Sequence, residues 1–160
     1  MKIAIAAIGQ LKAGPEKLLA GDYETRIPVL GRKAGITGLV IQDWPESRQR
    51  DEKLRKAEEA ERLWSIVPEG GAVVPLDERG DSLSSEAFAK FISAQAEKGT
   101  RQLTFMIGGP DGHAPETRAK ALKSIALGPM VWPHRLVRVM LLEQIYRSVT
   151  ILVSHPYHRA

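Results

Sequence analysis

The chain has 160 residues, which is long enough for one compact domain to bury a hydrophobic core without covalent cross-links. It has no cysteine, which excludes disulfides, thiolate nucleophiles and zinc–thiolate sites and suits a cytoplasmic protein. Its formal net charge of +4 favours anionic partners, although charge alone does not separate a phosphate backbone from an anionic membrane. No apolar run approaches the roughly 20 residues of a membrane helix, so we expect no membrane insertion.

Strand-length apolar runs alternate along the chain with segments of helical periodicity. The runs are residues 2–8, 36–42, 71–76, 102–107 and the short 130–132; the expected helices are 46–67, 82–98, 115–126 and 133–149. This alternation predicts an α/β fold with a mainly parallel sheet and helices on both faces. We see no repeat or internal boundary, so residues 1–160 are expected to form a single domain.

Two segments between the strands differ in how clearly they can be interpreted. Residues 46–67 are dense in alternating charges, and Leu54, Ala57, Ala60 and Trp64 recur at helical steps, which predicts an amphipathic helix with a solvated outer face. Its interleaved acids disfavour an RNA-tracking role. Residues 12–34 show no clear pattern and are treated as a loop region.

A glycine turn, Gly108-Gly109-Pro110-Asp111-Gly112, follows the run 102–107 directly. Glycines at the carboxyl end of a buried strand let a ligand approach the backbone closely, and ligands of open α/β sheets bind at that edge. The spacing matches neither the dinucleotide fingerprint nor a Walker loop. Taken alone, a motif of this kind is more often only a tight turn.

A second candidate segment is Leu127-Gly128-Pro129-Met130-Val131-Trp132-Pro133-His134. Two prolines stiffen this stretch, and exposed backbone N–H and C=O groups in a stiff loop can recognise the edge of an adenine. The alternative is a well-packed connection in which Trp132 belongs to the core.

The C-terminal tail, Ser154-His155-Pro156-Tyr157-His158-Arg159-Ala160, concentrates side chains that suit RNA. Tyr157 can stack on a base, Arg159 can hold a phosphate, and His155 or His158 can accept a proton near neutral pH. A solvated tail is one alternative. Metal binding by the two histidines is another, but no third ligand is evident beside them, and we expect no metal.

Four motifs occur here in a fixed order: the glycine turn, Pro133-His134-Arg135-Leu136-Val137-Arg138, Glu143-Gln144-Ile145-Tyr146-Arg147 and His155-Pro156-Tyr157-His158-Arg159. In these motifs, and in its length and first strand, the chain closely resembles the ribosomal large-subunit RNA methyltransferase H (RlmH) family of the SPOUT superfamily. The resemblance implies a C-terminal trefoil knot, a homodimer and S-adenosylmethionine as cofactor. It also implies methylation of N3 of a pseudouridine in large-subunit (23S) ribosomal RNA on the assembled ribosome.

Carried over by position, the resemblance implies two sets of site residues. The cofactor set is Leu76, Gly108, Gly109, Leu127, Gly128, Pro129, Met130, Val131, Trp132 and Pro133, and the catalytic set is His155, Tyr157, His158 and Arg159. Three residues depart from common forms of the family: Val131 replaces a frequent threonine, Ser154 a usual asparagine, and His113 an apolar residue. They affect details of adenosine and substrate contacts rather than the reaction class.

Two other functions are compatible with parts of the sequence. A non-catalytic, ribosome-associated RNA-binding protein would use the basic charge and the aromatic tail alone. A Rossmann-type oxidoreductase is disfavoured because no Gly-x-Gly-x-x-Gly follows the first strand. Thermal stabilisation by the cofactor would separate these possibilities.

Overall fold

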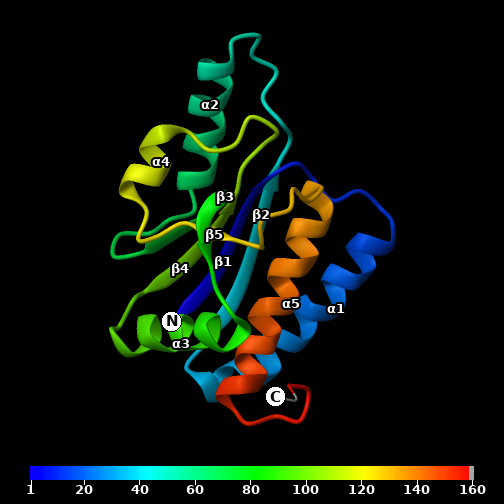
Figure 1. The fold of residues 1–160 in the computed structure, drawn as a ribbon, viewed down its shortest axis with the longest axis vertical. Helices are drawn as coiled ribbons and strands as arrows, with labels where there is room; N and C mark the ends of the chain where they lie inside the picture. Colours follow the sequence, from blue (N-terminus) through cyan, green and yellow to red (C-terminus); the bar gives the residue numbers. More distant parts are fainter. Residues whose placement is uncertain (159–160) are drawn as a thin grey trace.

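The computed structural model describes residues 1–158 and contains a five-stranded parallel sheet. The strands are β1 (Lys2–Ile8), β2 (Gly38–Trp44), β3 (Ala72–Ser82), β4 (Gln102–Ile107) and β5 (Ile125–Ala126), in the spatial order β2-β1-β4-β3-β5 (Figure 1). The predicted α/β fold with a parallel sheet is confirmed.

Helices cover both faces of this sheet, as predicted. They are α1 (Pro15–Gly31), α2 (Glu52–Trp64), α3 (Ser85–Glu97), α4 (Pro115–Lys120) and α5 (His134–Leu152), with a short 3₁₀ helix η1 (Arg32–Ala34) after α1. Helices α1, α3 and α5 lie on one face, and α2 and α4 lie on the other (Figure 1). Within residues 1–158, no helix is both long and apolar enough to span a membrane.

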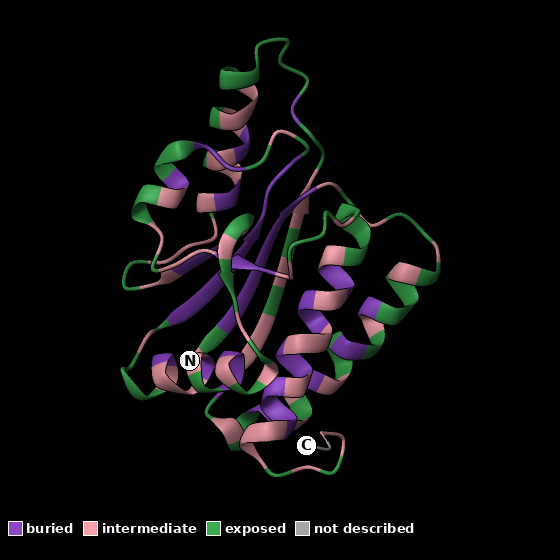
Figure 2. Ribbon diagram, in the orientation of Figure 1, coloured by how far each residue is buried: buried purple, intermediate pink, exposed green. Residues whose placement is uncertain are grey.

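The central strands are apolar at nearly every position because both of their faces are covered. In β1, Ile3 and Ile5 pack into the core beneath α1, α3 and α5, whereas Ala6 and Ile8 pack with Leu63 of α2. Figure 2 shows the middle of the sheet as continuously buried ribbon. Burial on two sides therefore explains why these strands lack a polar–apolar alternation.

The expectation of a loop at residues 12–34 is wrong, because most of this segment forms α1. Pro15 begins the helix, where a missing N–H costs nothing, and only Ala20, Tyr23 and Ile27 form its buried stripe with Gly31. Exposed apolar residues hide that stripe in the sequence: Leu18, Leu19 and Val29. The helical period was therefore obscured by hydrophobic residues that α1 leaves at the surface.

The expected strand at residues 130–132 is also wrong. Met130 and Val131 are 67% and 82% exposed in a loop, and the last strand is instead β5. Residues 115–126 were predicted as one helix, but α4 ends at Lys120 so that Ile125 can pair with β3. Gly80 permits this close approach, since a Cβ there would lie 2.6 Å from the backbone N of Ile125.

The helix expected at residues 46–67 begins later and buries a different stripe. Asp51 caps α2 by accepting a hydrogen bond from the backbone N–H of Leu54 at 2.9 Å. Leu54 is 56% exposed, and the buried residues of α2 are Glu59 and Leu63. The apolar stripe proposed from the sequence is therefore only partly correct.

A buried arginine ties α5 to the carboxyl ends of two strands. Arg138 is 4% exposed, and it donates to Asp43 Oδ2 at the end of β2 and to the backbone oxygen of Gly9 after β1, both at 2.5 Å. This pair of contacts fixes the first turns of α5 above the sheet edge that carries the candidate site.

We expect Arg138→Ala to lower the free energy of unfolding by about 3 kcal/mol, because it leaves Asp43 and the Gly9 carbonyl without their partner. Chemical denaturation measures the change. Asp81→Ala is the control: its ion pair with Lys123 is 66% exposed on the aspartate side and is expected to contribute about 1 kcal/mol or less. Equal losses in the two variants would contradict the assigned role of Arg138.

Candidate active site

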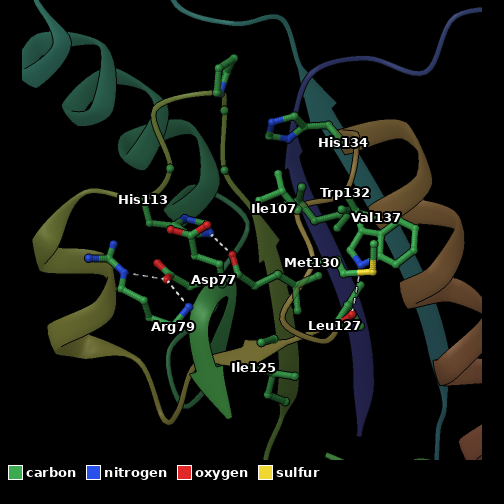
Figure 3. Close-up of a pocket in the computed structure, with 18 of the residues that line it drawn as sticks. Asp77, Arg79, Ile107, His113, Ile125, Leu127, Met130, Trp132, His134 and Val137 are labelled. Atoms are coloured by element: carbon green, nitrogen blue, oxygen red, sulfur yellow. Dashed lines mark hydrogen bonds and ion pairs between the residues drawn. The ribbon is translucent and has the colours of Figure 1, made fainter. Parts of the chain in front are cut away.

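A cavity of about 280 Å³ opens at the carboxyl ends of β4 and β5, beside the middle of β3. Its walls are residues 76–79 in the middle of β3, where the pairing with β4 ends, the glycine turn (residues 108–112) and the loop 127–132 (Figure 3). The cavity therefore lies where open α/β sheets bind their ligands.

Most residues of the predicted cofactor set line this cavity. They are Leu76, Gly108, Gly109, Leu127, Gly128, Met130, Val131 and Trp132. The two prolines of the set, Pro129 and Pro133, are exposed and lie outside the lining. Three segments that are distant in the sequence are thus brought together around one space.

At Gly109 the glycine turn is packed too closely for a side chain. A Cβ on Gly109 would lie 2.6 Å from the carboxylate of Glu59, a residue of α2 that is 4% exposed. The same carboxylate accepts a hydrogen bond from the backbone N–H of Ser47 at 2.9 Å. Asp111 pairs with Arg55 of α2 at 2.7 Å. Helix α2 therefore holds the turn in place from behind the cavity.

The loop 127–132 is stiffened by its own contacts. Gly128 adopts a φ of +97°, which favours glycine, and Trp132 Nε1–H donates to the backbone oxygen of Leu127 at 3.2 Å. Trp132 is half-buried and lines the cavity, so it is part of the site wall rather than of the core. Met130 and Val131 present exposed apolar surface beside the same space.

One buried acid lies at the β3 side of the cavity. Burial alone would raise the pKa of Asp77, but the backbone N–H of Arg79 and the charges of Arg118 and Arg79 lower it below the usual range. The side chain of Asp77 is only 7% exposed and carries a negative charge near neutral pH. Figure 3 shows Asp77 and Arg79 at one end of the cavity and His134 at the other.

His113, one of the three departures from the family, is buried under the cavity. Its Nε2 lies 3.1 Å from the backbone oxygen of Leu76, so this nitrogen carries the hydrogen. Within residues 1–158 its Nδ1 has no hydrogen-bond partner. Burial lowers the pKa of His113, which keeps the ring neutral near pH 7. The neutral ring links the glycine turn to the middle of β3.

The described part of the tail (residues 154–158) packs against α5 of the same chain. The ring of Tyr157 meets Tyr146 of α5 edge-on at 4.9 Å, and its hydroxyl lies 3.3 Å from Glu143 Oε1. Burial, the nearby Tyr23 hydroxyl and the Glu143 carboxylate raise the pKa of Tyr157 to about 12, so the phenol stays neutral. Arg159 lies outside the described residues.

The two tail histidines differ in their hydrogen bonds. His155 Nδ1 accepts from the backbone N–H of Tyr157 at 3.2 Å. His158 Nε2 lies 3.3 Å from Glu86 Oε1, and within residues 1–158 its Nδ1 has no partner. The pKa of Glu86 lies below the usual range, held there first by its own backbone N–H and then by Ser84, so its carboxylate is ionised. In the part of the chain described, no three potential ligands gather to hold a metal.

Sequence reasoning missed Asp77, Glu59 and Glu86 as neighbours of the site residues. Asp77 directly follows Leu76, so its place at the end of the apolar run 71–76 was available as a signal. Glu59 lies four residues before buried Leu63 and so shares its helical face, but the surrounding charges concealed it. Glu86 lies beside the tail only because α3 packs on α5, and no pattern in the local sequence predicts that packing.

Residues 1–158 match the family described as predicted SPOUT methyltransferase. The chain belongs to this family. It is 50% identical over 160 residues to a protein of Rhodopseudomonas palustris strain BisB18 named ribosomal RNA large subunit methyltransferase H, with 100% of both chains covered. A Bradyrhizobium diazoefficiens protein of the same name is 49% identical, again with both chains fully covered. The resemblance inferred from the ordered motifs is thus confirmed over the full length.

A solved structure gives a weaker match. The SpoU methyltransferase AviRb from Streptomyces viridochromogenes, in complex with AdoMet, matches 96% of this chain and 61% of its own, with 12% identity and a TM-score of 0.42.

We expect Gly109→Ala to weaken ligand binding in the cavity, because the added methyl would collide with the Glu59 carboxylate and displace the turn. The dissociation constant of S-adenosylmethionine, measured by calorimetry, should rise at least about tenfold, a cost of about 1.4 kcal/mol. Gly112→Ala is not a clean comparison because Gly112 has a positive φ, whereas the unhindered Gly21 on α1 is a suitable control. Unchanged affinity in Gly109→Ala would contradict the close packing of the turn.

We expect acid to destabilise the wild type more than His113→Leu. The pKa of His113 is lowered in the folded protein, so between about pH 7 and about pH 5 the unfolded state binds more protons than the folded state. The free energy of unfolding therefore decreases as the pH is lowered through this range. Leucine removes this contribution. Melting temperatures of both proteins across that range test the prediction, and parallel declines would show that His113 titrates alike in both states.

Proposed function

We propose that this protein transfers a methyl group from S-adenosylmethionine to large-subunit ribosomal RNA in the cytoplasm, and that its target atom is N3 of a pseudouridine. The observation that carries the proposal is the cavity itself: motif segments typical of the methyltransferase H relatives converge on it from three parts of the chain. The single-domain organisation of residues 1–160 and the trefoil knot in the C-terminal third are part of the same proposal.

The residues around the cavity fit this cofactor. Its ammonium and sulfonium groups are cationic, and the buried carboxylate of Asp77 supplies a complementary charge. The backbone of Gly109 and of the loop 127–132 can approach the adenosine closely, and exposed Met130 and Val131 offer it apolar contact. Bound there, the cofactor supplies a methyl group on a positively charged sulfur.

The proposed catalytic tail and the proposed cofactor cavity lie at opposite ends of α5. This helix has 19 residues, so its ends are about 28 Å apart at a rise of about 1.5 Å per residue. His134 at its start lines the cavity, whereas Tyr157 packs on Tyr146, about 18 Å further along the axis. A tail held in this way can serve only the cavity of another copy, which favours a homodimer with shared sites.

The face of α1, α3 and α5 offers a surface for that second copy. A largely apolar cavity of about 600 Å³ is lined there by residues that include Leu19, Leu83 and Met140, and it adjoins the cofactor cavity at Leu127 and Gly128. Leu18 and Leu19 of α1 are 79% and 47% exposed beside it. Covering this apolar face in a dimer would also bring two sites close together.

We propose that His158, rather than His155, is the base that accepts the proton from the imide N3–H of the substrate. The ionised Glu86 only accepts, so the contact fixes the hydrogen of His158 on Nε2 and leaves a lone pair on Nδ1. This Nδ1 is buried within residues 1–158, so proton transfer to it requires the tail to shift as the target base docks. In neutral His155 the bond from Tyr157 N–H occupies Nδ1, so its other nitrogen is a donor. Glu86 then positions the base, as an acid does for many catalytic histidines.

Tyr157 and Arg159 complete the proposed catalytic set. The single hydroxyl hydrogen of Tyr157 points to Glu143, so the residue would hold the target base through its ring. Arg159 can bind a phosphate or stabilise the negative charge that develops as the imide loses its proton. Positioning and proton removal are therefore the contributions of the chain's own residues.

Transfer of labelled methyl from S-adenosylmethionine to intact ribosomes, separated subunits and free ribosomal RNA tests the function. The RNA must come from cells that lack the corresponding activity. We expect label on one pseudouridine of the large-subunit RNA. Cofactor binding without label on any of these would reassign the substrate, and RNA binding without cofactor binding would favour the non-catalytic alternative.

Truncation after Val153 should abolish methyl transfer while S-adenosylmethionine still binds. Mixing this truncated chain with full-length Gly109→Ala should restore about a quarter of wild-type activity, because half of the random pairs are mixed and each holds one complete site. Each variant alone, assayed at the same total concentration, is the control. Transfer at a near-normal rate by the truncated chain would overturn the role of the tail.

A further inference from the structure

Beside the cofactor cavity lies a second, cationic hollow that the proposed chemistry does not use. It has a volume of about 330 Å³ and is lined by the segment after β1, the segment after β2 and the first turns of α5. The basic and imidazole side chains in its wall are Lys12, His134, Arg135 and Arg138. His134 lines both this hollow and the cofactor cavity.

The start of α5 adds further positive potential. The first N–H groups of a helix have no intrahelical partner, and here Pro133 provides no side-chain cap. The first turn contains no acidic residue that would neutralise the helix dipole. Since α5 has 19 residues, its positive end is fully developed and faces the same hollow as Arg135.

Arg138 provides an independent sign that this hollow receives an anion. The residue is 4% exposed and lines the hollow, and within residues 1–158 its Nε has no hydrogen-bond partner. Its other contacts go to Asp43 and the Gly9 carbonyl. A buried guanidinium with an unused donor is costly unless a ligand or water completes it. Among the described residues that line the wall, one is acidic, the exposed Glu46.

We propose that this hollow, formed around Lys12, His134 and Arg135, binds a backbone phosphate of the substrate RNA next to the nucleotide that enters the cofactor cavity. This inference rests on the proposed function, which supplies a polyanionic substrate. The shared residue His134 places the phosphate at the rim of the cavity (Figure 3), so that one bound phosphate orients the neighbouring base toward the methyl group. Arg138 is a positioning residue that holds the site against β1 and β2.

The test compares Arg135→Gln and Lys12→Gln with wild type, using large ribosomal subunits as the substrate. Both side chains are exposed, so the variants should fold, and unchanged melting temperatures verify this. We expect KM for the subunits to rise about tenfold in Arg135→Gln, as for loss of one charge-assisted contact. The slope of log affinity against log salt should fall by about one. The dissociation constant of S-adenosylmethionine should stay unchanged.

Lys33→Gln is the matched control, because Lys33 is an exposed cation on η1, before β2 and so at the opposite edge of the sheet. It should leave both KM and the salt slope as in wild type. Wild-type transfer with unaltered KM and salt slope in Arg135→Gln and Lys12→Gln would overturn the phosphate site and leave the proposed function standing. Weaker cofactor binding with unaltered subunit binding would also overturn it, by assigning the hollow to the cofactor's carboxylate. Absence of transfer by the wild type would instead overturn the function on which the inference rests.

Discussion

The parallel arrangement of the strands is the constraint on which the rest of this structure depends. Because each strand returns through a crossover helix, all carboxyl ends meet at one edge of the sheet. The glycine turn and the loop 127–132 follow such ends, and they share a cavity with the part of β3 that lies just beyond its last pair with β4. The same edge carries the cationic hollow beside it, so methyl donor and RNA backbone would be held by neighbouring strand ends.

Helix α5 organises what the sheet edge alone cannot. Near its start, Arg138 donates hydrogen bonds to Asp43 and Gly9, and His134 lines both the cofactor cavity and the cationic hollow. At its end, Tyr146 receives Tyr157 of the tail. The length of one rigid helix thus separates the proposed catalytic residues from the proposed cofactor residues, and the proposed second copy of the chain would bring them together.

The predictions from sequence succeeded where a physical cause acts locally. Because both of their faces are buried, β1 and β4 are apolar at most positions, and glycine follows each of them, so the sheet could be predicted. The ordered motifs identified the family. The prediction missed helix α1 because its exposed leucines mask the helical period. It missed β5 because this two-residue strand depends on Gly80, which belongs to a distant segment. Neither cause is visible within a window of sequence.

The sequence by itself determined the fold class, the family and the segments that form the candidate site, because strand burial, helical periodicity and motif order are properties of neighbouring residues. Only the tertiary structure decided which charges act together. Glu59 behind Gly109, Glu86 beside His158 and Arg138 between β1 and β2 join residues that are distant along the chain. Such contacts depend on how the helices pack onto the sheet, and this packing cannot be predicted from the spacing of side chains along one segment.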